Sequence, residues 1–199
     1  MSEVRIAIIG WGSLVWDPRP DFDSQIGNWA SGGPVLPVEF CRISSSRKGA
    51  LTLVIEKDLG TEVETFYAIS RRRDPQDAVC DLRSREGTIL QKIGFADLST
   101  GEQRSRDAEV AKIIKDWATQ KNIQFVVWTD LESNFQVKKS TEFCDAALNH
   151  LKSLSSDGVR EAVKYIVRTP QQINTRLRQW LATVDWFKEQ VALFKNNVC

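Results

Sequence analysis

Glu86 is the acidic side chain whose place in the sequence best suits proton transfer. A short helix is predicted to begin at Asp74, which can cap it, and to end before Gly87. Its apolar stripe is formed by Ala78, Val79 and Leu82. Glu86 follows Leu82 by one helical turn, so it falls on the apolar face and also in the last turn, where the helix dipole disfavours a negative charge. Desolvation there should raise the pKa of this carboxyl, as a general base or acid requires. An ion pair with a nearby arginine, or a solvated helix end, is the structural alternative.

A glycine-containing turn follows the first apolar run of the chain. Residues 4–9 read as a buried strand, and Gly10-Trp11-Gly12-Ser13 ends it. Exposed backbone N–H groups in such a turn can hold a phosphate or a carboxylate. A tight turn that binds nothing fits equally well, because a lone Gly-x-Gly is a weak signal. Nucleotide binding is disfavoured, since no further glycine or Lys-Ser/Thr completes a phosphate-binding motif.

The cysteines and the single histidine argue against other kinds of site. The four cysteines are Cys41, Cys80, Cys144 and Cys199, and none is paired at Cys-x-x-Cys spacing. Without a Cys/His cluster no zinc site is predicted. A Cys-His pair or a Ser-His-Asp triad would need His150, which lies among helix-forming residues. We therefore expect neither a metal nor nucleophilic catalysis of these types.

The composition is that of a globular protein. The chain has 199 residues, 42% of them hydrophobic and 27% charged, with a net charge of +1. One domain is expected at this length. The balanced charge gives no reason to expect nucleic acid or an anionic membrane as a partner. We expect a cytoplasmic protein, because there is no signal-peptide pattern, no apolar run long enough to span a membrane, and the thiols are scattered.

Short strands joined by turns precede and follow the Glu86 helix. After a long loop over residues 17–33, alternating patterns predict strands at 37–44, 50–56 and 61–70. The first two flank a polar turn centred on Arg47, which reads most simply as a solvated hairpin. A strand over 88–98, a helix over 106–120 and a strand over 123–129 complete this part. The pattern favours an antiparallel sheet or barrel over a βαβ array.

The last third of the chain reads as three helices. Ser140 and Asp157 can cap the first two, and Thr169 opens a capping box for the third. The third helix would carry an apolar stripe from Ile173 to Phe194 over roughly 35 Å. Such a stripe suits a core or a dimer surface, so a homodimer is one arrangement that it allows.

Four of these features occur in the order of a known family. The chain resembles the γ-glutamylcyclotransferase-like superfamily, in particular its ChaC-like branch. Family members open with a strand and a Tyr-Gly-Ser-Asn/Leu turn, which resembles Trp11-Gly12-Ser13-Leu14 with Trp16 two residues on. The segments that follow in the family are similar to Phe40–Gly49, Glu64–Ile69 and Arg85-Glu86-Gly87.

The resemblance implies a fold, a reaction and a set of site residues. The fold would be α+β: a small mixed β-barrel with peripheral helices, formed by residues 1–138 of a single 1–199 domain, with residues 139–199 as a helical extension packed on it. The reaction would be cyclisation of a γ-glutamyl peptide or amine to 5-oxoproline, without metal or cofactor. Glu86 is the family's catalytic residue. Trp11, Gly12, Ser13 and Leu14 would form the substrate-binding turn, and Arg47 would bind a second carboxylate.

Two further hypotheses come from other functional classes. A non-catalytic protein on the same fold could use the glycine turn to hold a carboxylate-bearing metabolite. The family's tyrosine several residues after the glutamate has no counterpart in residues 88–98, which favours this reading. Alternatively, the apolar stripe of the last helix could make the chain an assembly protein.

Overall fold

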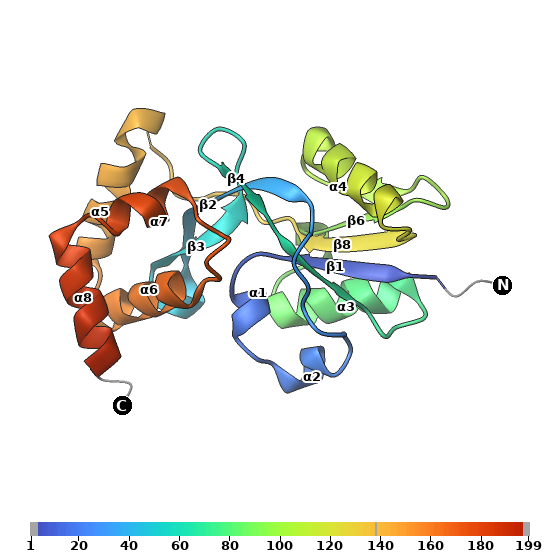
Figure 1. The fold of residues 1–199 in the computed structure, drawn as a ribbon, viewed down its shortest axis with the longest axis horizontal. Helices are drawn as coiled ribbons and strands as arrows, with labels where there is room; N and C mark the ends of the chain where they lie inside the picture. The colour runs from blue at the N-terminus through green and yellow to red at the C-terminus, as the bar shows by residue number, and fades with distance from the viewer. Residues whose placement is uncertain (1–3, 138, 197–199) are drawn as a thin grey trace. The chain divides into compact units, whose positions relative to one another are not determined.

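The structure, a computed structural model, is of the mixed α+β class. It describes residues 4–137 and 139–196, so Cys199 lies outside the described residues. Its strands form two sheets, one of five strands and one of three. The chain divides into two compact units (Figure 1). The first unit consists of Met1–Leu36 with Glu64–Leu131, and the second of Pro37–Val63 with Glu132–Cys199.

The sheet of the first unit is built around the first strand of the chain. Its strands are β1 (Ile6–Gly10), β5 (Phe66–Ile69), β6 (Ile93–Asp97), β7 (Gln103–Arg104) and β8 (Phe125–Thr129). They lie in the order β5-β1-β8-β6-β7. β1 is antiparallel to β5 and parallel to β8, while β6 is antiparallel to both of its neighbours. All residues of β1 are buried, as a continuous apolar run predicts for an inner strand.

Two helices lie on opposite sides of this sheet (Figure 1). They are α3 (Pro75–Glu86) and α4 (Ala108–Gln120), and a short 3₁₀ turn, η2 (Leu90–Lys92), precedes β6. α3 packs its stripe into a hydrophobic cluster with Ile6 and Ile8 of β1. Leu82 is fully buried there, which stabilises the fold by about 1.5–3 kcal/mol.

The segment predicted to be a long loop has structure of its own. It follows α1 (Ser13–Trp16) and contains α2 (Pro20–Asp23). Beyond α2 it runs beside β5, where the N–H groups of Gly27 and Ala30 donate to the carbonyl oxygens of Ile69 and Tyr67 at 2.7 and 2.8 Å. These bonds cover backbone groups at the edge of the sheet, which would otherwise be open to pairing with another chain.

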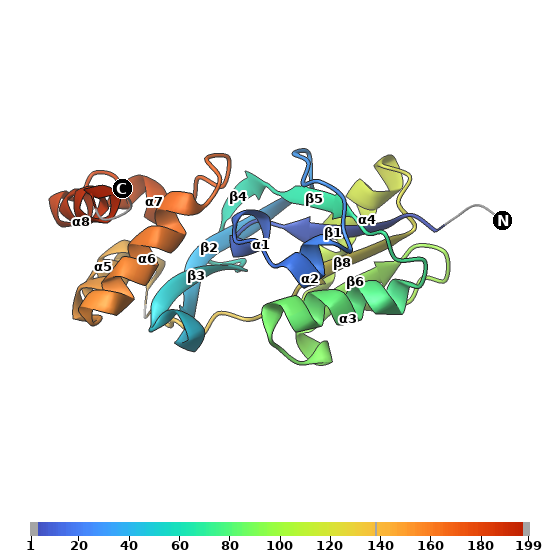
Figure 2. The same cartoon turned by 90° about the horizontal axis from the view of Figure 1, so that it is seen from below.

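The second unit packs four helices with the three-stranded sheet. The strands β2 (Val35–Ser44), β3 (Ala50–Ile55) and β4 (Thr61–Glu64) lie in the order β3-β2-β4, and a 3₁₀ turn, η1 (Ser45–Arg47), joins the first two. After a further turn, η3 (Ser140–Glu142), come α5 (Phe143–Ser153), α6 (Ser156–Arg168), α7 (Arg176–Leu181) and α8 (Asp185–Asn196). α6 packs against β3, and α8 packs against α6 (Figure 2).

The prediction of a single long C-terminal helix from the apolar stripe is wrong, because the structure has two helices there. α7 ends at Leu181: the N–H of Ala182 still bonds to Arg178, but those of Thr183 and Val184 bond three residues back, to Trp180 and Leu181. The Thr183 hydroxyl also donates to the carbonyl oxygen of Trp180 at 2.7 Å. Ile173, Leu177, Leu181 and Phe187 of the stripe are buried within the second unit, which weakens its use as an assembly surface.

Two of the predicted helix caps are replaced by a nearby residue, and the third, Ser140, lies in η3 and does not cap α5, which Glu142 precedes without a side-chain cap bond. Thr169 does not open α7; its hydroxyl donates to Tyr165 at the end of α6, and Thr175 caps α7 instead. Ser155, rather than Asp157, caps α6 by accepting from Gly158. In both cases a second capping residue lies close to the predicted one, and spacing alone does not choose between them.

The strand predicted over residues 61–70 is divided at Thr65. Its first half, β4, belongs to the three-stranded sheet, and its second half, β5, belongs to the five-stranded sheet. The Thr65 hydroxyl donates to the carbonyl oxygen of Pro34 at 2.7 Å, and the Thr65 carbonyl accepts from Gly33 at 3.0 Å. The described strands form two sheets, and the predicted closed barrel is not confirmed.

Candidate functional site

The helix that carries Glu86 forms as predicted. The Asp74 side chain accepts from the N–H of Gln76, Pro75 occupies the first turn, and Gly87 ends the helix in the left-handed region at a φ of 59°. Ala78, Val79 and Leu82 are the buried residues of α3. Glu86 is half-buried in the last turn. The helix thus holds this carboxylate at a partly desolvated end.

The predicted glycine turn follows β1 directly. Trp11 and Leu14 are buried, and Gly12 is the residue before α1, with φ −124° and ψ −138°. Neither Gly10 nor Gly12 has a positive φ. Gly10 is needed for a different reason, because a Cβ atom there would lie 2.8 Å from the indole ring of Trp29. The predicted close approach of the backbone to another group is therefore made, at Gly10, by an aromatic ring.

Arg85 joins the Glu86 helix to this turn. Its Nη2 donates to the carbonyl oxygen of Ser13 at 3.0 Å and to that of Asp17 at 2.8 Å. These two carbonyls lie at the beginning of α1 and just after its end, so one guanidinium group spans the single helical turn. Sequence analysis missed this contact because Arg85 fits the last turn of a helix as an ordinary dipole-compensating residue.

The Arg85 guanidinium is a partly buried charge, and its surroundings shift its pKa. Its Nε is buried and has no hydrogen-bond partner among the described residues. Burial lowers the pKa of the Arg85 guanidinium, while the negative charge of the neighbouring Glu86 opposes this shift. The arginine and the glutamate are therefore electrostatically coupled at the end of α3.

Replacing Arg85 with methionine is expected to lower the free energy of unfolding by about 2 kcal/mol, because hydrogen bonds to a charged group are lost at two backbone carbonyls. Amide hydrogen exchange in residues 13–17 should become faster, since the clamp on α1 is gone. Urea unfolding and exchange mass spectrometry would measure the two effects.

The matched control is Arg83→Met. Arg83 lies in the same helical turn but is exposed, and its Nη2 donates to the hydroxyl of Ser84 at 3.2 Å. The control should change stability by no more than about 0.5 kcal/mol. Equal effects of the two substitutions would show that the Arg85 clamp does not stabilise the turn.

Arg47, the other predicted substrate ligand, belongs to the second unit. Its guanidinium lies 3.8 Å from the carboxylate of Glu161 and 5.0 Å above the ring centre of Tyr165, both on α6. The Arg47 side chain is 15% exposed. These contacts give it a role in fixing η1 on α6.

The ring of His150 is held by contacts within the fold. The Nε2 atom of His150 lies 2.8 Å from the carbonyl oxygen of Gly49, and its ring packs beside Phe135. Among the described residues, Cys41, Cys80 and Cys144 form no disulfide bond. In residues 4–137 and 139–196, no group of three or more His, Cys, Asp and Glu side chains could hold a metal ion.

Sequence analysis also missed a pocket beside α1, of about 370 Å³, in the first unit. Leu14, Trp16, Asp17, Asp23, Trp29 and Arg71 are among its lining residues. Of the predicted site residues, only Leu14 lines it. The three aromatic and apolar residues among these were visible in the sequence, but nothing in their spacing indicated that they meet.

Comparison with known proteins does not identify the chain: no protein-family model matches it, and no curated protein is similar enough to match. In the part of the chain that the structure describes, no helix combines the length and apolar character needed to cross a membrane. The reading that follows therefore rests on the residues and their geometry.

Proposed function

We propose that this protein is a γ-glutamylcyclotransferase-like enzyme that converts a γ-glutamyl peptide or amine to 5-oxoproline and the free amine. One observation supports the proposal most strongly. Arg85, adjacent to Glu86, donates to the carbonyl oxygen of Ser13, which lies 72 residues away in the sequence. The residue next to the candidate base therefore contacts the candidate substrate-binding turn, and both segments lie in one compact unit.

The proposed reaction needs few protein groups. Glu86 accepts a proton from the α-ammonium of the substrate, and the resulting amine attacks the γ-carbonyl carbon within the same molecule. This proximity removes much of the entropic barrier. The backbone N–H groups of Gly12, Ser13 and Leu14 would hold the α-carboxylate or the oxyanion of the tetrahedral intermediate. As the bond between the γ-carbon and the leaving nitrogen breaks, Glu86 gives that nitrogen the proton it took. Glu86 then takes the second proton from the attacking nitrogen, which leaves the neutral five-membered lactam, and passes it to the released amine.

Several finer expectations belong to the same proposal. They include the closed barrel of the family, a role for Trp11 in shaping the turn, Arg47 as a ligand of a second carboxylate, and a cytoplasmic location. An experimental structure with a γ-glutamyl ligand would test the first three. The non-catalytic alternative is favoured by the pocket beside α1, because a metabolite could bind there without contacting Glu86.

The direct test is release of 5-oxoproline by the full chain from glutathione, γ-glutamyl dipeptides and γ-glutamyl amines. Turnover of any of these compounds would support the enzyme. If none is turned over by folded protein, the enzyme proposal fails and the binding-protein reading takes its place.

A further inference from the structure

The pocket beside α1 combines aromatic surface with charges of both signs. Its lining residues are Leu14, Val15, Trp16, Asp17, Pro18, Asp23, Ile26, Gly27, Asn28, Trp29 and Arg71. Its volume of about 370 Å³ lies within the range of small-molecule sites. Of the residues placed in the proposed reaction, Leu14 lines this pocket, whereas Glu86 and Gly12 do not.

Trp29 is held in a fixed position at this pocket. Two atoms of its indole ring lie 2.8 Å from where a Cβ atom on Gly10 would be, so the ring packs directly on the end of β1. It also packs against the hydrophobic cluster beneath α3. With half-buried Trp16, it gives the pocket two large planar surfaces, on which a flat apolar group can stack.

The two carboxylates in the lining are oriented by the chain around them. Asp23 accepts from the backbone N–H of Arg19 at 2.8 Å through Oδ2. Asp17 forms an ion pair with Arg19 at 3.5 Å. A carboxylate has two oxygens that can accept several hydrogen bonds, so an ammonium group can add to the contacts that these side chains already make.

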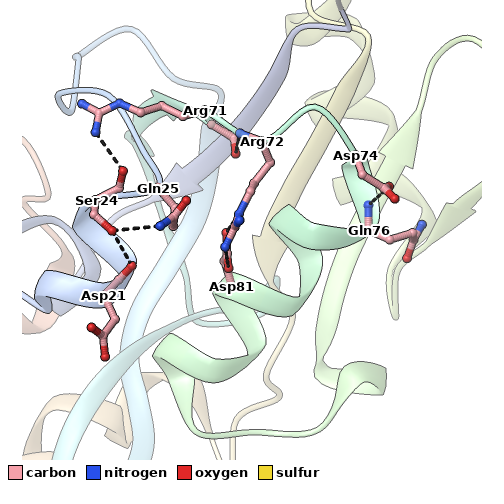
Figure 3. A network of polar contacts seen from close by, with 9 residues as sticks. Asp21, Ser24, Gln25, Arg71, Arg72, Asp74, Gln76 and Asp81 are labelled. Atoms are coloured by element: carbon pink, nitrogen blue, oxygen red, sulfur yellow. Dashed lines mark hydrogen bonds and ion pairs between the residues drawn. The ribbon is translucent and has the colours of Figure 1, made fainter.

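Arg71 brings the opposite charge to the same pocket. Figure 3 shows its side chain reaching towards Ser24, whose carbonyl oxygen accepts from Nη1 at 2.8 Å. The N–H of Arg71 also donates to the carbonyl oxygen of Gln25 at 2.8 Å. A guanidinium has five N–H donors, so this bond leaves others that can bind a carboxylate.

We infer that this pocket binds a free α-amino acid with an aromatic side chain. The carboxylates would repel a simple anion, and Arg71 would repel a simple cation, whereas a zwitterion satisfies both charges. In the bound state Asp23 and Asp17 take the ammonium, Arg71 takes the carboxylate, and the side-chain ring packs between the indoles. This inference does not depend on the proposed cyclotransferase reaction.

Isothermal titration with three related probes tests the inference. They are L-phenylalanine, phenethylamine, which lacks the carboxylate, and 3-phenylpropionate, which lacks the ammonium. We expect L-phenylalanine to bind at least about 10-fold more tightly than either analogue, because each analogue loses a charge-assisted interaction. Absence of L-phenylalanine binding at about 10 mM, or equal binding of all three probes, would overturn the inference.

Single substitutions then assign each charge. Arg71→Gln should weaken binding of L-phenylalanine by about 10-fold and leave phenethylamine unchanged, whereas Asp23→Asn should weaken L-phenylalanine and leave 3-phenylpropionate unchanged. Arg83→Gln, at an exposed position outside the pocket, is the control and should bind as wild type does. Unchanged binding in both pocket variants would place the ligand elsewhere.

Glu86→Gln separates this site from the proposed catalytic one. It should retain wild-type affinity for L-phenylalanine, because Glu86 does not line the pocket. Loss of L-phenylalanine binding in Glu86→Gln would show that the pocket is not separate from the proposed catalytic site. Failure of the 5-oxoproline assay, with binding intact, would reject the proposed reaction alone.

Discussion

Replacing Glu86 with glutamine is expected to reduce 5-oxoproline release by a factor of about 100 or more, the usual contribution of a general base. Glutamine has nearly the same shape and retains an acceptor oxygen, but it cannot take the proton from the substrate's ammonium group. The loss should therefore fall on kcat, with little change in KM. Steady-state kinetics on the best substrate of the panel would measure it.

Glu109→Gln is a matched control for this substitution. Glu109 is exposed in the first turn of α4, within the same unit, and takes no part in the proposed chemistry. This control should retain wild-type turnover. Turnover that persists in Glu86→Gln would show that another group is the base. Circular dichroism of both variants would establish that they are folded.

The elements that could be predicted from the sequence are those fixed by local signals. Asp74 directly precedes α3 and Gly87 directly follows it, and both make the contacts that their residue types favour. The same holds for β3 and for the turn after β2, where Lys48 and Gly49 both have a positive φ. Local sequence carries this information because caps and turns depend on contacts between near neighbours.

Contacts between distant segments could not be predicted in this way. Arg85 looks like a surface residue until the chain brings Ser13 beside it. The residues around the pocket come from α1, from the 17–33 segment and from Arg71, and no period relates them. Glu39 illustrates the same limit: an alternating pattern would put a glutamate on the polar face of a strand, but Glu39 is buried in β2.

Replacing Glu39 with alanine is expected to lower the free energy of unfolding by about 3 kcal/mol, the largest stability effect that we predict. Glu39 is fully buried in β2. Its Oε1 accepts from the N–H of Phe40 at 2.9 Å, and its Oε2 accepts from the N–H of Leu177 at 3.3 Å and from the hydroxyl of Thr61 at 3.5 Å. Alanine would leave buried donors without an acceptor and would open a cavity.

These contacts give Glu39 a defined structural task. Leu177 lies in the first turn of α7, where backbone N–H groups have no partner within the helix. The carboxylate supplies one acceptor there and so fastens α7 to β2. Glu62→Ala, at an exposed position of β4 in the same sheet, is the control and should change stability by no more than about 0.5 kcal/mol. Equal losses in the two variants, measured by urea unfolding, would refute this role.

Glu39 also makes stability depend on pH. Burial raises its pKa, against the opposing effects of hydrogen bonds from Thr175, Phe40 and Leu177 and of the charge on Arg176. Above about pH 4.3 the unfolded chain has released a proton that the folded protein still holds, so the free energy of unfolding falls as pH rises through the raised pKa. The full contribution of Glu39 to stability is present at pH values below the pKa that this residue has in the unfolded chain.

Glu39→Gln isolates that contribution, because glutamine has no proton to release in this range. The substitution will itself cost stability, since the amide NH₂ faces groups that donate to the carboxylate, but that cost does not vary with pH. The difference in unfolding free energy, wild type minus Glu39→Gln, should therefore decrease from about pH 4 upwards, by at most about 1.4 kcal/mol per pH unit. Titratable groups common to both proteins cancel in this difference. A difference that stays constant, or increases with pH, would mean that Glu39 ionises in the folded protein as readily as in the unfolded chain.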